Sequence, residues 1–213
     1  AAALRLDELA RPRPAEVYAV SQVERYLACP FKYFAARVLG LDEERDDESG
    51  LSPQERGQLL HEVFQTFFTR WQERGGRAIT ADSLAEALEL YTSVAESTLA
   101  RLGEADRALE RTYLLGSAVA PGLGERAFNF EIEHDVPVLE RLLEHSLEGT
   151  FEFKGPDGPR AISVRGKADR IDLLADGTLR VIDYKLGRAP KTARALQLPV
   201  YSVCAGQQLK GRH

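Results

Sequence analysis

The sequence predicts an α+β fold, with a helical N-terminal half followed by a small mixed sheet that helices surround. Apolar side chains recur at helical spacing through most of residues 18–149. After Gly149 the pattern changes to β-prone runs, separated by Gly-Pro-Asp-Gly and by Ala-Asp-Gly. These runs cover residues 150–153, 161–174 and 178–184. A last helix is expected over about 192–207, and an antiparallel hairpin is expected within the sheet.

The composition is that of an ordinary globular protein, with 44% apolar and 29% charged residues among 213. No apolar run approaches the roughly 18 residues of a membrane helix, and no secretory signal is visible, so no membrane partner is expected. Two cysteines, Cys29 and Cys204, make no disulfide framework and indicate a reducing, cytoplasmic setting. The net charge of −5 counts against a broadly basic DNA-binding surface. Carboxylates that hold a cation contribute to that charge, however, without repelling DNA once the metal is bound.

The pattern indicates one domain with an arm before it. Residues 1–17 begin with three alanines and contain two prolines, so we expect a linker or arm arriving from an upstream part of a larger protein. The domain is expected over residues 18–213, with a helical part over 18–149 and an α/β core over 150–207.

Local signals place the helices of the helical part. Ser21 is expected to cap the first helix, with Glu24 completing a capping box. Pro30 interrupts this helix and begins a second, which ends at Gly40. The remaining helices are expected at about 53–74, 82–102 and 104–115, and over 123–146 as one long helix kinked at Pro137.

The chemistry-bearing residues lie on the hairpin around Ala175-Asp176-Gly177. A two-residue turn would place Asp169 opposite Tyr184, so that Asp169 and Asp183 point to opposite faces. A three-residue loop with its glycine left-handed shifts the pairing by one. Asp169 then faces Asp183 directly, and Lys185 points to the same side. The sequence permits both registers, and the chemistry of the residues favours the second.

Two carboxylates directly opposite each other repel by roughly 3 kcal/mol at 5 Å and an effective dielectric of 20. A divalent cation between Asp169 and Asp183 would reverse that sign, and Mg²⁺ is typically held by one or two carboxylates with room for water and phosphate oxygens. Lys185 beside such a site can orient or deprotonate a water, or offset charge on a transition-state phosphate. Asp183 also ends an apolar run, where a charge needs a partner. These residues therefore predict metal-dependent phosphodiester hydrolysis.

Five motifs resemble those of the RecB-like branch of the PD-(D/E)xK nuclease superfamily, found at the C-terminal end of RecB and AddB helicase–nucleases. They are S-x-x-E-x-Y-x-x-C-P-F, G-x-x-x-H, G-x-x-D-R-x-D, D-Y-K and Q-x-x-x-Y. In this chain they match residues 21–31, 57–61, 166–172, 183–185 and 197–201, in that order. Each motif alone is weak, but five in the right order with workable spacing are strong. The resemblance implies a restriction-endonuclease-like core with the active site on the hairpin.

The resemblance also implies roles for individual residues. The expected ligands of the catalytic metal, Mg²⁺ or Mn²⁺, are His61, Asp169, Asp183 and the Tyr184 carbonyl. Lys185 would be the catalytic lysine. The residues expected to contact the DNA or support the site are Gln197, Tyr201 and Arg170.

Two further expectations concern the surroundings of the site. A glutamate just before the hairpin often assists catalysis in this family, and Glu148 is expected in that role, with Glu152 second. Gly57, four residues before His61 on the same helix face, is expected to give room for close approach of the strands.

Cys29 raises the question of a metal cluster. In AddB and some CRISPR-associated relatives, the cysteine of C-P-F joins three C-terminal cysteines on a [4Fe–4S] cluster. Such a cluster needs four thiolates. Since Cys204 is the only other cysteine, no cluster is expected in this chain, and Cys29 is either a remnant ligand or a buried cysteine.

The function implied is a metal-dependent DNA nuclease, expected to be an exonuclease, that works with a helicase domain or subunit in double-strand-break repair. The chain has no Walker A sequence, so no ATPase activity is expected of it. Two alternatives remain. One is a catalytically inactive nuclease fold used as a scaffold or DNA-binding module, and the other is a CRISPR-associated RecB-like exonuclease. The presence of both aspartates and the lysine favours activity.

Overall fold

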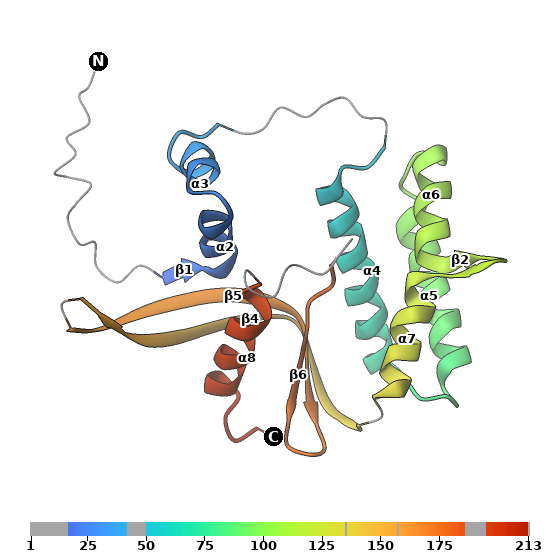
Figure 1. The fold of residues 1–213 in the computed structure, drawn as a ribbon. Coiled ribbons are helices and arrows are strands. Elements are labelled where there is room, and N and C mark those ends of the chain that lie inside the picture. The colour runs from blue at the N-terminus through green and yellow to red at the C-terminus, as the bar shows by residue number, and fades with distance from the viewer. Residues whose placement is uncertain (1–16, 42–49, 135, 157, 186–194, 213) are drawn as a thin grey trace.

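A long antiparallel hairpin forms the centre of the fold (Figure 1). The computed structural model describes residues 17–41, 50–134, 136–156, 158–185 and 195–212. The hairpin consists of β4 (Val138–Gly155) and β5 (Gly158–Leu174). The other edge of β5 pairs in parallel with β1 (Val17–Ala19) and antiparallel with β6 (Leu179–Ile182). The sheet is therefore mixed, and the predicted α+β class is confirmed.

The described residues form seven helices and, besides the sheet, one small hairpin. The helices are α2 (Val20–Ala28), α3 (Pro30–Arg37), α4 (Pro53–Glu73), α5 (Leu84–Leu99), α6 (Glu104–Leu115), α7 (Leu123–Glu133) and α8 (Gln197–Gln208). The small hairpin is β2 (Gly116–Ser117) with β3 (Ala120–Pro121). The helices predicted near 53–74, 82–102 and 104–115 are thus confirmed as α4, α5 and α6.

Helices α4 to α7 pack around an aromatic core beside one end of the sheet (Figure 1). Ser52 and Glu55 form a reciprocal capping box at the start of α4. The helix then buries Phe64, Phe67 and Phe68, each no more than 1% exposed. Burying a side chain of this size contributes roughly 1.5–3 kcal/mol. This core fixes the position of α4, the helix that carries His61.

A second core lies between the sheet and helices α2 and α8. It joins Val20 of α2 and Leu147 of β4 to Tyr201 and Cys204 of α8. Helix α8 therefore follows the hairpin in sequence and packs back onto it, as Figure 1 shows. This packing brings the Q-x-x-x-Y segment to the same strands that carry the carboxylates.

The helix expected over 123–146 is wrong in its second half. Helix α7 ends at Glu133, and β4 begins at Val138 and continues for 18 residues. Leucine and glutamate favour a helix locally, but Pro137 has no N–H with which to continue one. Pairing with β5 along almost its whole length then makes the segment a strand. The sheet accordingly starts well before the position near 150 where the sequence placed it.

Several helix ends also differ from expectation. Ser21 does not cap α2, because the N-cap is Ala19 and Ser21 lies inside the helix. Of the expected arm over residues 1–17, only Val17 is described, and it begins β1. The last helix begins at Gln197, and the expected start at 192 lies outside the described residues. Gly40, expected to end the second helix, has a φ of +66° three residues after α3.

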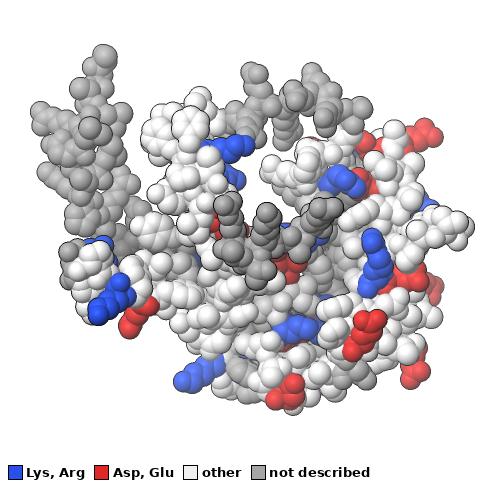
Figure 2. All heavy atoms as spheres, viewed as in Figure 1, with Lys and Arg blue, Asp and Glu red and all other residues white. Residues whose placement is uncertain are grey.

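The surface carries both signs of charge. Figure 2 shows Lys and Arg side chains mixed with Asp and Glu over the described part of one face, with acidic groups gathered over the side formed by α5 to α7. Within the described ranges, no helix is both long and apolar enough to cross a bilayer.

Candidate metal centre

The turn between β5 and β6 has the three-residue form that aligns the two aspartates. Gly177 has a φ of +82°, and the Leu174 N–H donates to the Thr178 carbonyl at 3.0 Å. The ladder pairs Arg170 with Ile182, so the next position in the same register sets Asp169 opposite Asp183. The second of the two registers is therefore confirmed, because glycine accepts the left-handed conformation that the bulge requires.

A third carboxylate, Glu144, completes this row on β4. The pairs Leu143–Arg170 and His145–Ala168 bracket Glu144 and place it opposite Asp169. Its φ is +50°, and it is the one described non-glycine residue with positive φ. This conformation costs a β-carbon-bearing residue roughly 1–2 kcal/mol. The strained backbone therefore lies at the point where three carboxylates converge.

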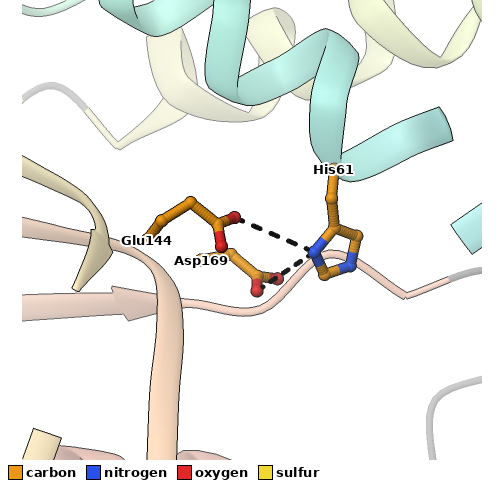
Figure 3. A group of neighbouring side chains, drawn as sticks. All are labelled: His61, Glu144 and Asp169. Atoms are coloured by element: carbon orange, nitrogen blue, oxygen red, sulfur yellow. Dashed lines mark ion pairs between the residues drawn. The ribbon is translucent and has the colours of Figure 1, made fainter. Parts of the chain in front are cut away.

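His61 reaches this row from α4, as Figure 3 shows. Its Nδ1 lies 3.3 Å from an Asp169 carboxylate oxygen and 4.0 Å from one of Glu144. Its Nε2 donates to the Tyr184 carbonyl at 3.1 Å, since a carbonyl only accepts. The hydrogen bond with Asp169 raises the pKa of His61, partial burial opposes this rise, and Tyr184 and Glu144 add to it.

His61, Glu144 and Asp169 form the one group among the described residues that could hold a metal ion, with ligand atoms within 4.8 Å of one another. The set fits a divalent cation, because one imidazole and two carboxylates supply nitrogen and oxygen donors without soft sulfur. A divalent cation would also offset the repulsion between these aligned carboxylates, which Lys167 offsets at Glu144 in this structure. The donor chemistry therefore supports a metal at this position.

Glu144 is the residue that sequence reasoning missed. The structure does not bring Glu148 or Glu152 to the group: Glu148 is exposed opposite Arg165, and Glu152 is exposed opposite Ala161. Glu148 lies four residues from Glu144, about 13 Å along a strand. Treating 123–146 as helix hid the relation, whereas a strand through this segment would have set a glutamate against Asp169.

Asp183 and Lys185 lie beside the group and pair with each other. Lys185 Nζ is 3.0 Å from an Asp183 oxygen, and the Asp183 side chain is only 8% exposed. Burial raises the pKa of Asp183, and the hydrogen bond from Lys185 opposes that rise. The three-membered group does not include Asp183, so its role as a metal ligand stays a prediction.

Tyr184 fixes the strand end between these residues. Its N–H donates to Asp169 at 2.6 Å, and its carbonyl accepts from His61. Its ring stacks on Phe64 of α4, with ring centroids 4.4 Å apart. The residue thus anchors the backbone of the D-Y-K motif in the helical core. Its carbonyl faces Nε2 of His61, on the other ring nitrogen from the carboxylates, and its role as a metal ligand stays a prediction.

Tyr201 and Gln197 lie on α8, which packs against the strands. Tyr201 is 4% exposed and packs on Gly166, where an added β-carbon would come within 2.2 Å of the tyrosine ring. The glycine of G-x-x-D-R-x-D is therefore required by this contact. Burial raises the pKa of Tyr201, and Asp183 and Asp169 contribute to the rise. The backbone N–H of Gln197 donates to Glu24 of α2 at 3.0 Å.

Arg170 does not reach the surface. Its side chain is 1% exposed, forms ion pairs with Glu131 and Asp172, and lies 4.2 Å from the centroid of the Phe68 ring. A direct contact with DNA is incompatible with this burial, so only the supporting half of its expected role fits. The sequence left both roles open for Arg170, because it could not show which buried acids surround the guanidinium.

The two cysteines differ in burial. Cys29 is half-buried between α2 and α3, and Cys204 is buried under Gly149. Burial raises the pKa of the Cys204 thiol. Cys204 therefore acts as an apolar packing residue, and this chain does not supply the four thiolates of a cluster.

Comparison with known proteins gives the same family as the motifs. The family model described as the PD-(D/E)XK nuclease superfamily matches residues 18–213. The chain is 31% identical, over 91% of its length, to an ATP-dependent helicase/deoxyribonuclease subunit of Moorella thermoacetica. It is also 31% identical, over 81% of its length, to the protein of the same name from Symbiobacterium thermophilum. It spans 18% and 16% of these relatives. The chain belongs to the PD-(D/E)XK nuclease superfamily.

Proposed function

We propose that this chain is a divalent-metal-dependent deoxyribonuclease domain that hydrolyses phosphodiester bonds. One observation carries the proposal: His61 of α4, Glu144 of β4 and Asp169 of β5 converge within 4.8 Å, with Asp183 and Lys185 beside them. Three elements distant in sequence thereby contribute donors to one point. Aligned carboxylates repel one another, and a bound cation would offset that repulsion in addition to Lys167, which pairs with Glu144.

The residues divide the chemistry between them. His61, Glu144 and Asp169 would hold Mg²⁺ or Mn²⁺, with Asp183 and the Tyr184 carbonyl as further ligands. When bound, the cation would polarise a phosphoryl oxygen and lower the pKa of a bound water. Lys185 would give up its ion pair with Asp183, and its ammonium group would then orient the attacking water or offset charge on the phosphate. Tyr184, stacked on Phe64, keeps the strand end in place, and α8 closes the far side.

The wider setting is also part of the proposal. The names of the relatives pair a deoxyribonuclease with an ATP-dependent helicase, which supports DNA as the substrate and a helicase domain or subunit as the partner. We expect exonuclease activity in double-strand-break repair, in the bacterial cytoplasm, where both cysteines stay reduced. A linear and a circular single-stranded DNA of equal length test this point, because an exonuclease degrades only the linear one.

The central test is nuclease activity with and without the aspartate. The wild-type chain should degrade a labelled oligodeoxynucleotide in Mg²⁺ or Mn²⁺ and not in EDTA, and Asp183→Ala should lose at least about a hundredfold in rate, or roughly 2.7 kcal/mol. The proposal fails if Asp183→Ala retains the Mg²⁺-dependent rate of the wild type. DNA binding by a wild-type chain without any metal-dependent cleavage would instead indicate an inactive scaffold.

A further inference from the structure

Gly57 occupies a position where glycine has no evident structural reason. It is the fifth residue of the 21-residue helix α4. Glycine inside a helix destabilises it relative to alanine, because glycine loses more backbone freedom on folding. Glycine is nevertheless needed at positions where φ is positive or where a neighbouring atom occupies the space of a β-carbon. Gly57 is not among the positive-φ glycines, and no described atom lies within 4 Å of an added β-carbon.

Other glycines of the chain show the contrast. An added β-carbon would come within 2.3 Å of Tyr91 at Gly124 and within 2.2 Å of Tyr201 at Gly166. Those glycines are needed for packing. The expectation that Gly57 lets the strands approach α4 closely is therefore wrong, since no described strand residue occupies the space beside it. The space left by its missing side chain is available to a ligand.

That space is a cleft of about 310 Å³ on the His61 side of α4. Its lining residues are Gly57, Gln58, His61, Glu62, Gln65 and Glu144. His61 and Glu144 belong to the candidate metal centre, so a molecule in the cleft would lie next to the reacting phosphate. The volume is at the lower end of the roughly 300–1,000 Å³ of small-molecule sites, which suits one nucleotide rather than a duplex.

The lining favours a neutral, hydrogen-bonding group over a phosphate. Neither lysine nor arginine is among the described lining residues, and two of those residues are glutamates. Glu62 is paired with Arg101, and Glu144 with Lys167. The amides of Gln58 and Gln65 each offer a donor and an acceptor, which match the edge of any base. A base can also lie flat against a helix turn that has no side chain.

We infer that this cleft receives the nucleobase of the nucleotide adjoining the cleaved bond, and that Gly57 is glycine because the base packs against its bare backbone. The inference rests on the proposed function. A β-carbon at Gly57 would then stabilise the helix and weaken the binding of the substrate. Stability and DNA affinity would change in opposite directions, which a purely structural role does not produce.

The matched control is Gly206 of α8. This glycine is also helical, it has no positive φ, and no described atom lies within 4 Å of an added β-carbon, although it is exposed whereas Gly57 is half-buried. It is not among the residues that line the cleft. Gly206→Ala should therefore stabilise its helix as Gly57→Ala does, without affecting DNA.

The test measures thermal unfolding and the anisotropy of a labelled oligodeoxynucleotide in EDTA, so that no hydrolysis is needed. Both variants should raise Tm by about 2–4 °C. Gly57→Ala should weaken binding about fivefold or more, on the scale of one base contact, and Gly206→Ala should leave it unchanged. With an oligomer of abasic residues, wild type and Gly57→Ala should bind alike.

Three outcomes would overturn the inference. They are wild-type affinity in Gly57→Ala, an equal loss on normal and abasic oligomers, and no binding by the wild type. Gln58→Ala with Gln65→Ala gives a second route, because it removes the amides without altering the helix backbone, and it should also weaken binding only of the base-bearing oligomer. Because binding is measured without hydrolysis, the two failures can be told apart. A chain that discriminates base from abasic DNA but never cleaves would refute the nuclease proposal and leave only a base-binding cleft beside the carboxylates.

Discussion

Arg170 of β5 and Glu131 of α7 form a two-pronged ion pair in the interior, with side chains 1% and 8% exposed. The same guanidinium donates to Asp172, which also accepts from Arg141 and Arg180. Burial alone would raise the pKa of Asp172, but the hydrogen bond from Arg170 and the surrounding arginines hold it below its usual value. The pair connects the helical layer to the strand that carries Asp169.

Removing one member of this pair should destabilise the fold strongly. Glu131→Ala leaves the buried guanidinium of Arg170 with only Asp172, which it shares with Arg141 and Arg180. Breaking a buried pair in this way costs about 3–5 kcal/mol. The matched control is Glu96→Ala, which removes the partner of Arg111 from a pair whose side chains are 42% and 53% exposed. That change should cost at most about 1 kcal/mol. Urea unfolding measures both, and equal losses would show that the buried pair does not contribute as its burial implies.

Glu144 is expected to contribute to cation binding, and Glu148 is not. Glu144→Gln should weaken Mn²⁺ binding about tenfold or more, a loss of at least roughly 1.4 kcal/mol, because it removes one charged ligand. Glu148→Gln removes the same charge four residues along the same strand, so it controls for net charge. Calorimetric titration of Mn²⁺ measures both. A larger effect at Glu148 would restore the residue that the sequence suggested.

His61 should make the stability of the protein in EDTA depend on pH. Its pKa in the fold is raised above 6.5, mainly by the hydrogen bond with Asp169. The stabilisation is therefore fully present below pH 6.5 and is lost as pH rises through the folded pKa. The difference in unfolding free energy between wild type and His61→Asn should be larger at about pH 5.5 than at about pH 8.5. Urea unfolding at the two pH values measures it, and a difference that grows toward high pH would contradict the ion pair with Asp169.

The same protonation should oppose cation binding. A cation must replace the proton on the ring nitrogen, so Mn²⁺ affinity should rise with pH through the range in which His61 loses its proton. His61→Asn should bind Mn²⁺ more weakly and with a smaller dependence on pH across this range. Calorimetric titrations at several pH values check both, and a pH dependence that survives the substitution in full would assign it to another group, such as Asp183.

Features that depend on local chemistry could be predicted from the sequence. The turn Ala175-Asp176-Gly177 limits the hairpin to two registers, because the turn is a local feature of three residues, and the chemistry of Asp169 and Asp183 selects the one that the structure shows. Helix α4 follows from its apolar spacing. For these elements, local preference and the final fold agree.

Features that depend on distant partners could not be predicted. The segment that becomes β4 has a helical pattern of leucine and glutamate, and only the hydrogen bonds to β5 make it a strand. Glu144 was missed for that reason. The sequence left open whether Arg170 contacts DNA or supports the site for a related reason, since Glu131 lies 39 positions away in the sequence. Glu24 is a further example, because the residues that donate to it, Leu196 and Gln197, follow it by 172 and 173 positions.

Glu24 of α2 should act as the N-terminal cap of α8. One carboxylate oxygen accepts from the N–H groups of Leu196 and Gln197 at 2.9 and 3.0 Å. Because these N–H groups begin the helix that carries Tyr201, Glu24→Ala should cost about 1–2 kcal/mol and expose the first turn of α8. Glu24→Gln keeps an acceptor oxygen and loses only the attraction between charge and helix dipole, so it should cost about 0.3–1 kcal/mol.

Hydrogen exchange distinguishes this cap from a general loss of stability. In Glu24→Ala, the amides of Leu196 and Gln197 should exchange faster than those of the later turns of α8, and in Glu24→Gln they should stay close to wild type. Equal acceleration throughout α8 in both variants would mean that Glu24 acts through packing of α2. If the cap is local, Glu24→Ala should also lower the nuclease rate by a larger factor than Glu24→Gln, because Gln197 and Tyr201 lose their fixed position beside the strands.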